Sequence, residues 1–144
     1  MNTLSRYQQK SLKLAAEKKK SFAIDHYNCS VNMKNPMCGD EVQVRVDLIN
    51  KKINNISAIV RGCALCEASA GLVVQLFKNN SIPHNDFMKD FLIWLNNTGQ
   101  EINSPLPKEL EIFLPIKEIS NRHTCITMPF EATIKSLKST NKGK

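Results

Sequence analysis

The sequence predicts an α+β fold in which helices pack on one face of a three-stranded antiparallel sheet. The first observation is a set of three short strand-like segments, separated by turns, in the first half of the chain. The second is the order of elements, with one helix before these strands and three helices after them. The third is the absence of an internal repeat or composition break over 144 residues, a length typical of one domain. We therefore expect residues 1–144 to form a single domain.

The strand segments are defined by alternation and by the turns between them. Residues 42–48 (VQVRVDL) alternate apolar and polar side chains, as in a strand with one buried face. Residues 22–33 contain a loop and a short strand, and residues 56–60 (ISAIV) complete a hairpin. Turns are predicted at residues 35–40 (NPMCGD), where Pro and Gly favour a change of direction, and at residues 50–55 (NKKINN).

The helical segments are defined by apolar side chains at helical spacing. Small residues between Cys63 and Lys78 let that helix lie close to the sheet, and Pro129 is tolerated only in the first turn of the last helix. Helices are predicted over residues 3–20, 63–78, 85–95 and 126–138, with a short amphipathic piece over residues 108–119.

The net charge of +7 comes from the two ends of the chain. Residues 1–20 carry six basic and one acidic side chain, residues 135–144 carry four Lys, and residues 21–134 hold ten basic and twelve acidic side chains. Basic ends confer solubility or weak anion affinity, and no groove-reading motif accompanies them, so we expect no specific nucleic-acid binding. Residues 139–144 are expected to form a flexible basic tail. No apolar run approaches the ~20 residues that cross a bilayer, so we expect no membrane association.

Five cysteines occur in a chain whose first 20 residues lack the apolar stretch of a secretory signal. This combination predicts a reducing, cytoplasmic location, where cysteines serve metal binding or catalysis more often than a disulfide framework. The odd number also excludes complete internal pairing. The cysteines are Cys29, Cys38, Cys63, Cys66 and Cys125.

Three of these cysteines stand where the chain changes direction. Cys38 lies in a turn, Cys63 lies between a strand and a helix, and Cys125 comes just before the last helix. Asp40 follows Cys38 across a glycine, so both side chains can turn toward one point. Three thiolates and a carboxylate suit a tetrahedral zinc site, or an incomplete cysteine set for an iron–sulfur cluster. The spacing alone leaves a second interpretation open, in which the three cysteines are small buried hydrophobic residues.

Three motifs, taken in order, resemble the iron–sulfur cluster scaffold family that includes IscU, SufU and the N-terminal domain of NifU. Residues 35–40 (NPMCGD) resemble the family's NP-x-CGD motif. Residues 61–70 (RGCALCEASA) are similar to its second motif, a Gly-Cys pair followed by a helix of small residues. Residues 121–125 (NRHTC) supply the third cysteine. The resemblance covers about residues 3–138 and implies the family's SufU/IscU-like α+β fold.

The SufU-like branch matches the sequence better than the IscU type. Cys63 and Cys125 are 62 residues apart, as in the SufU type, whose insertion corresponds to the extra helix and polar loop between them. The IscU type has His directly before its third cysteine, whereas that position is Thr124 here and His123 lies one residue further back. Arg122 matches the Arg-x-x-Cys pattern of the SufU type.

This resemblance implies a zinc ion held by Cys38, Asp40, Cys63 and Cys125, and sulfur transfer from a SufS-like cysteine desulfurase. A histidine of the partner takes one coordination position, which frees Cys38 to attack the persulfide of the desulfurase. Zinc keeps thiolates deprotonated at neutral pH and restrains their oxidation. Sulfur then passes to downstream iron–sulfur assembly or to apo-proteins. Any enzymatic activity is that of a sulfur carrier acting with the desulfurase.

Three more side chains are candidates for accessory roles. Arg122 is a candidate to stabilise a thiolate or persulfide by its charge, or is a surface residue. Cys66 follows Cys63 by three residues, on the same helix face, as an accessory thiol or a packed helix residue. His123 could replace Asp40 or cap the site, or face solvent.

Two other functions remain open. The same three cysteines, Cys38, Cys63 and Cys125, could assemble a transient [2Fe–2S] cluster that is passed to apo-proteins. An independent hydrolytic zinc enzyme is the remote alternative. Four protein ligands close the metal to water, and no Glu or His stands in a motif suited to a general base.

Overall fold

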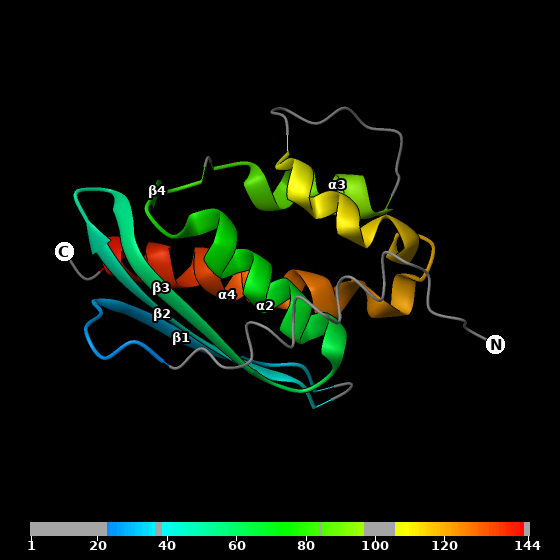
Figure 1. Cartoon of the computed structure of the whole chain (residues 1–144), viewed down its shortest axis with the longest axis horizontal. Coiled ribbons are helices and arrows are strands. Elements are labelled where there is room, and N and C mark those ends of the chain that lie inside the picture. The colour runs from blue at the N-terminus through cyan, green and yellow to red at the C-terminus, as the bar shows by residue number, and fades with distance from the viewer. Residues whose placement is uncertain (1–22, 37–38, 84, 97–105, 143–144) are drawn as a thin grey trace.

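The computed structural model describes residues 23–36, 39–83, 85–96 and 106–142, with side chains as far as Lys138. It is an α+β fold, with helices on one side of an antiparallel sheet (Figure 1). The predicted helix over residues 3–20 lies outside the described residues. The strands are β1 (Cys29–Lys34), β2 (Glu41–Ile49), β3 (Lys52–Arg61) and β4 (Asn80–Ser81). The helices are α2 (Ala64–Phe77), α3 (Phe87–Asn96) and α4 (His123–Lys142), with 3₁₀ helices η1 (Lys108–Ile116) and η2 (Ser120–Arg122).

The sheet has four strands in the order β1-β2-β3-β4, so the predicted three-stranded sheet is wrong by one edge strand. The fourth strand, β4, follows α2 and pairs with Lys52 and Ile53 at the start of β3. Asn79 takes a positive φ of 67° and donates its backbone N–H to the Ile53 carbonyl over 2.7 Å. The end of α2 therefore returns the chain to the sheet edge, where only two residues join the ladder.

The hairpin between β2 and β3 has a tighter turn than predicted. Asn50 and Lys51 have φ values of 53° and 65°, and Ile49 pairs directly with Lys52. Such a pair of positive φ angles gives a two-residue loop whose twist matches that of the flanking strands. The strand β3 consequently begins at Lys52, and not at Ile56 as expected.

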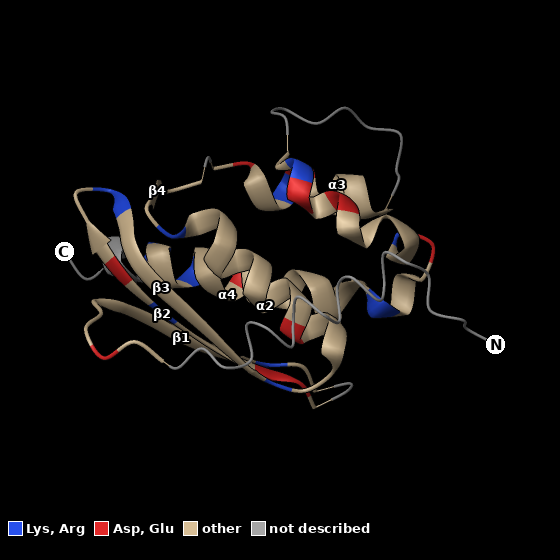
Figure 2. Ribbon diagram, viewed as in Figure 1, with Lys and Arg blue, Asp and Glu red and all other residues tan. Residues whose placement is uncertain are grey.

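Alternation along β2 directs its apolar side chains toward the helices. Val42, Val44 and Val46 are at most 2% exposed. Helix α4 packs over β1 and β2, and α2 packs over β3 and against α4. Helix α2 carries a single charged residue, so it is almost entirely tan in Figure 2. None of the helices in the described part of the chain is both long and apolar enough to span a bilayer.

Four aromatic rings join α3 to α2 and α4. Their centroids lie 5.1 to 6.0 Å apart, several of them edge to face, which is a favourable arrangement for aromatic rings. The helix predicted over residues 85–95 is thereby confirmed as a helix with a buried aromatic stripe. The rings belong to Phe77, Phe87, Phe91 and Phe130.

The last helix begins three residues earlier than predicted, at His123. Cys125 is therefore inside the first turn of α4 and does not precede the helix. Pro129 lies in the second turn, where it has no N–H to donate to the Cys125 carbonyl. The hydroxyl of Ser69 on α2 donates to the adjacent carbonyl of Ile126, which ties this part of α4 to α2.

Candidate metal centre

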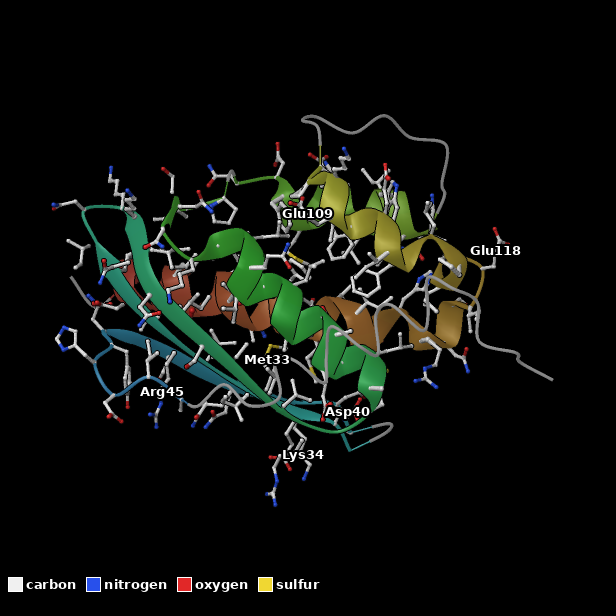
Figure 3. The ribbon with its side chains drawn as sticks, viewed as in Figure 1. Met33, Lys34, Asp40, Arg45, Glu109 and Glu118 are labelled. Carbon is white, nitrogen blue, oxygen red and sulfur yellow. The ribbon has the colours of Figure 1, made fainter. Side chains whose placement is uncertain are left out.

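Three chain segments bring Asp40, Cys63 and Cys125 together at one end of the sheet. Asp40 immediately precedes β2, Cys63 caps the N-terminus of α2, and Cys125 lies in the first turn of α4. One carboxylate oxygen and the two Sγ atoms all lie within 4.8 Å of one another. Figure 3 shows Asp40 at the end of the sheet beside the start of α2. These donor atoms are of the types that zinc binds in proteins.

The turn before β2 is held by backbone hydrogen bonds between its two ends. The N–H of Asn35 donates to the Asp40 carbonyl over 2.8 Å, and the N–H of Gly39 donates to the Asn35 carbonyl over 2.7 Å. Gly39 has a φ of 81°, a conformation that glycine adopts without strain. Cys38 lies outside the described residues, so its predicted role as a ligand and sulfur acceptor stays a prediction.

The carboxylate of Asp40 is fixed by its contact with the start of α2. Its Oδ1 atom accepts a hydrogen bond from the N–H of Cys63 over 3.2 Å. The residue is 5% exposed, and its Oδ2 atom has no hydrogen-bond partner among the described residues. A buried carboxylate oxygen without a partner is costly. A cation in the space between Asp40, Cys63 and Cys125 would satisfy it.

Gly62 provides the space that Asp40 occupies. A Cβ atom built at position 62 would lie 2.3 Å from Oδ1 and 2.5 Å from Cγ of Asp40. Any other residue would therefore displace the carboxylate. In the sequence, Gly62 is recognisable only as part of the Gly-Cys motif. The glycine is the one sequence signal of this contact, and it does not identify the side chain that needs the space.

Cys63 is held at the helix N-terminus as a capping residue. Its backbone is extended, with φ −74° and ψ 163°, and its Sγ atom accepts a hydrogen bond from the N–H of Cys66 over 3.4 Å. The free N–H groups and dipole of a helix N-terminus favour the thiolate form of a cysteine. Cys63 is half-buried and is thus more exposed than Asp40 and Cys125, which are 5% and 6% exposed.

Burial raises the pKa of the Cys125 thiol from 9.0 to about 12. The hydrogen bond with Cys63, the charge of Cys63 and the charge of Asp40 act in the same direction, whereas the guanidinium of Arg122 lowers the pKa. A thiol in this environment keeps its proton at neutral pH unless a metal ion replaces that proton. The donor set and its environment therefore fit a divalent cation.

Arg122 is close enough to Cys125 for its charge to act on the thiol. The side chain is partly buried, and its Nε atom has no hydrogen-bond partner among the described residues. Arg122 therefore places a guanidinium beside the cluster of Asp40, Cys63 and Cys125.

His123 does not belong to the cluster. The expectation that it faces solvent is wrong, because the residue is only 9% exposed. Its Nε2 atom lies 3.2 Å from the Ile116 carbonyl and 3.0 Å from the Lys117 carbonyl. Since a carbonyl only accepts, Nε2 carries the proton and fastens the end of η1 to the start of α4.

The two remaining described cysteines are buried, and neither contributes its sulfur to the cluster of Asp40, Cys63 and Cys125. Cys66 is 0% exposed in α2, and its thiol is not one of the three clustered donors. Cys29 is 3% exposed in β1, within the hydrophobic core. Cys66 is thus packed within α2, and its N–H contacts the Cys63 sulfur.

Comparison with known proteins gives one family match and several structural matches. The model of the NifU-like N terminal domain matches residues 6–95. No curated protein sequence matches the chain significantly. A nitrogen-fixing NifU-like protein (N-terminal) from Brucella abortus superposes with a TM-score of 0.80 at 16% identity, covering 96% of each chain.

Two further crystal structures have the same fold. One is a proposed iron–sulfur cluster assembly scaffold protein for the SUF system from Fervidobacterium islandicum, with a TM-score of 0.78, 21% identity, and coverage of 92% of this chain and 95% of that one. The other is a protein of undescribed function, with a TM-score of 0.71, 23% identity, and coverage of 90% and 98%. These likenesses establish the fold, and the sequence match, which spans more than half of the chain, establishes the family. The chain belongs to the NifU-like N-terminal domain family.

Proposed function

We propose that this protein accepts persulfide sulfur from a cysteine desulfurase at a zinc site formed by Cys38, Asp40, Cys63 and Cys125. Family membership gives the broader role, which is iron–sulfur cluster assembly. The observation that carries the finer proposal is the convergence of Asp40, Cys63 and Cys125, whose donor atoms lie within 4.8 Å of one another.

Two features of the site support this ligand set. Oδ2 of Asp40 is buried without a partner among the described residues, as expected of a carboxylate oxygen that binds a cation. His123 uses its Nε2 atom on backbone carbonyls, which favours a set without histidine. Cys38 precedes Asp40 by two residues in the sequence and is the natural fourth ligand. Bound zinc would keep the thiolates deprotonated and restrain their oxidation.

The sulfur-transfer step needs one nucleophile and one leaving group. The Cys38 thiolate attacks the terminal sulfur of the desulfurase persulfide, and a new S–S bond forms at Cys38. The S–S bond within the desulfurase breaks, and its cysteine leaves as a thiolate. Cys38 then carries the persulfide, which passes to downstream iron–sulfur assembly or apo-proteins. No external oxidant or reductant is required, because one S–S bond replaces another.

Arg122 is the side chain best suited to hold the persulfide anion. Its charge already acts on Cys125, and its buried Nε atom has no partner among the described residues. A guanidinium N–H group is a strong donor to an anion in a partly buried site. Arg122 would therefore stabilise the product form of the acceptor cysteine.

The competing function is a scaffold that assembles a transient [2Fe–2S] cluster on the same cysteines. The metal content and visible spectrum of protein purified without added metal separate the two. The zinc carrier is colourless and contains close to one zinc per chain. A brown protein that contains iron and sulfide would instead assign the scaffold role.

The direct test supplies the desulfurase with cysteine labelled at sulfur and follows the label. The label is expected as a persulfide on Cys38 of the zinc-loaded protein. Digestion with trypsin separates Cys38, Cys63 and Cys125 onto different peptides, so the acceptor is read directly. Label confined to Cys63 or Cys125 would assign the acceptor role elsewhere, and no label on the chain would contradict the carrier function.

A further inference from the structure

Cys66 is a buried thiol beside the metal centre that the sulfur-transfer reaction does not use. It is 0% exposed, and its backbone N–H donates to Sγ of Cys63 over 3.4 Å. Cys63 caps α2 and Cys66 lies three residues further on, in the first turn. The two cysteines therefore form a Cys-x-x-Cys pair at a helix N-terminus, the arrangement found in dithiol–disulfide oxidoreductases.

The spacing of this pair suits a disulfide. Residues three apart on a helix hold their Cβ atoms about 5–6 Å apart, and a disulfide needs about 3.5–4.5 Å. Cys63 is the capping residue: its carbonyl accepts the first helical hydrogen bond, from the N–H of Glu67 over 3.1 Å, while its own N–H donates to Asp40 outside the helix and its ψ of 163° is extended. A small rotation at Cys63 closes the remaining gap while the helix from Ala64 onward stays intact.

We propose that Cys63 and Cys66 form a reversible disulfide when a low-molecular-weight disulfide is present, and that this disulfide prevents metal binding at the centre. The inference rests on the proposed function in one respect, since it treats Cys63 as a ligand of the metal. Its consequence is that one ligand sulfur is withdrawn from the site. Metal uptake then depends on the thiol–disulfide balance around the protein.

The reaction proceeds by two thiol–disulfide exchanges. The half-buried Cys63 thiolate attacks one sulfur of the small disulfide, which forms a mixed disulfide and releases one thiolate. The sulfur of Cys66 then attacks Sγ of Cys63, and the bond between Cys63 and the small molecule breaks. The Cys66 proton leaves with the second small sulfur, which is released as a thiol. Two cysteine thiols are oxidised, and one small disulfide is reduced to two thiols.

Exposure determines the order of these steps. Cys63 is the member of the pair that a small molecule can reach, because Cys66 is 0% exposed. Cys66 needs no access to solvent, since it attacks from within the helix turn. Cys125 also lies near Cys63 and shares a hydrogen bond with it, so it is the competing partner in the metal-free protein. Cys66 lies in the same helix turn as Cys63, so their disulfide adds no link between α2 and α4.

The test begins with the full chain, stripped of metal under reducing conditions and then titrated with zinc. A second portion is treated with oxidised glutathione before the zinc titration, and a third is treated with oxidised glutathione and then with a dithiol. Zinc uptake is expected in the first portion, is expected to be lost in the second, and should return in the third. Failure of the reduced protein to bind zinc would contradict the proposed function. The disulfide would still be tested, because its detection by peptide mass does not depend on zinc binding.

Peptide mass measurement identifies the disulfide. Trypsin releases residues 62–78 as one peptide that contains both Cys63 and Cys66, whereas Cys125 lies in the peptide 123–135. After oxidation and alkylation of remaining thiols, the peptide 62–78 should be unalkylated and lighter by two hydrogen atoms. A cross-link between the two peptides, or glutathione retained on Cys63 of the wild type, would overturn the proposal.

Two variants test the role of Cys66 separately from its packing. In Cys66→Ser and Cys66→Ala, the reduced protein should still bind zinc, and oxidation should stop at a glutathione adduct on Cys63. Cys29→Ala is the matched control, because it removes another buried cysteine and should form the Cys63–Cys66 disulfide as the wild type does. The opposite outcome is that both Cys66 variants lose zinc uptake after oxidised glutathione and regain it after the dithiol, without a glutathione adduct. In that case the disulfide that prevents zinc binding involves another cysteine, which would overturn the proposal.

Discussion

A Cβ atom at position 62 would lie 2.3 Å from Oδ1 of Asp40, which is closer than real atoms approach without displacement. Gly62 and Asp40 therefore depend on each other, because the carboxylate of Asp40 occupies the space that a side chain at position 62 would need. Because Oδ1 also accepts the N–H of Cys63, a change at either residue shifts the metal centre.

Gly62→Ala is therefore expected to lower both stability and zinc affinity. The new methyl group displaces the carboxylate, and overpacking of this kind costs about 1–3 kcal/mol in the free energy of unfolding. Chemical denaturation of the metal-free protein measures the first effect, and zinc competition with a chromogenic chelator measures the second.

A double-mutant cycle assigns the cause of this loss. Asp40→Ala removes Oδ1 and Cγ, the two atoms nearest the added Cβ, so Gly62→Ala should cost less stability in that background. An equal cost in both backgrounds would mean that the loss does not come from the contact with the Asp40 carboxylate.

Asp40→Ala alone should weaken zinc binding and leave the fold in place. Loss of a group that hydrogen-bonds to a metal ligand already costs about 10–100-fold in metal affinity, so loss of a ligand itself should cost at least about tenfold. Glu41→Ala is the control, since Glu41 is the adjacent acid and its carboxylate lies 3.8 Å from Lys34 at the surface. Equal zinc affinity in Asp40→Ala and wild type would remove Asp40 from the ligand set.

Zinc binding should become tighter as pH rises and should release the proton of Cys125. Because the pKa of this thiol is raised to about 12, the metal-free folded protein still holds the proton below pH 9. Each proton released changes affinity by about tenfold per pH unit. Calorimetric titration in buffers of different ionisation enthalpy counts the protons, and Cys125→Ala should release one fewer.

The raised pKa of the Cys125 thiol also makes the metal-free protein less stable in alkaline solution. A folded pKa above the unfolded value gives a stabilisation that is fully present below about pH 9 and is lost as pH rises toward 12. The Cys125→Ala variant should lack this part of the pH dependence in denaturation measurements. Parallel pH profiles of the two proteins would contradict the assignment.

His123→Ala should destabilise the protein without changing its zinc content. The substitution leaves the carbonyls of Ile116 and Lys117 without the imidazole donor, and a buried unsatisfied group costs about 1–3 kcal/mol. Thr124→Ala, at the exposed neighbouring position, is the control. Loss of zinc from a variant that remains folded would show that His123 belongs to the site after all.

The features that the sequence predicted are those that leave a local pattern. Val42, Val44 and Val46 alternate with polar residues, and they do form the buried face of β2. The resemblance of residues 35–40, 61–70 and 121–125 to one family led to the expectation that Asp40 and Cys63 meet the third cysteine, Cys125.

The features that could not be predicted from the sequence depend on contacts between distant segments. The strand β4 has two polar residues and no alternation, so only its position after α2 makes it a strand. Polar residues at the start of β3 resemble a turn until the positive φ angles of Asn50 and Lys51 close the hairpin. The partners of His123 are backbone carbonyls of η1, and a carbonyl acceptor has no signal in a sequence.

Cys38→Ser should separate a sulfur acceptor from a structural metal site. A structural site contributes folding free energy through all of its ligands, so each cysteine loss should destabilise the protein to a similar degree. A sulfur acceptor requires asymmetry, because one thiolate must leave the ligand set and attack. The sequence predicts a Pro- and Gly-containing turn around Cys38, whereas Cys63 and Cys125 are fixed at the starts of helices. The Cys38→Ser protein is therefore expected to remain folded by circular dichroism and yet no longer stimulate a cysteine desulfurase. Cys29→Ala, which removes a buried cysteine of β1, should stimulate the desulfurase as the wild type does. Full stimulation by Cys38→Ser, or its unfolding together with Cys63→Ser and Cys125→Ser, would show that the site is structural or that another cysteine accepts the sulfur.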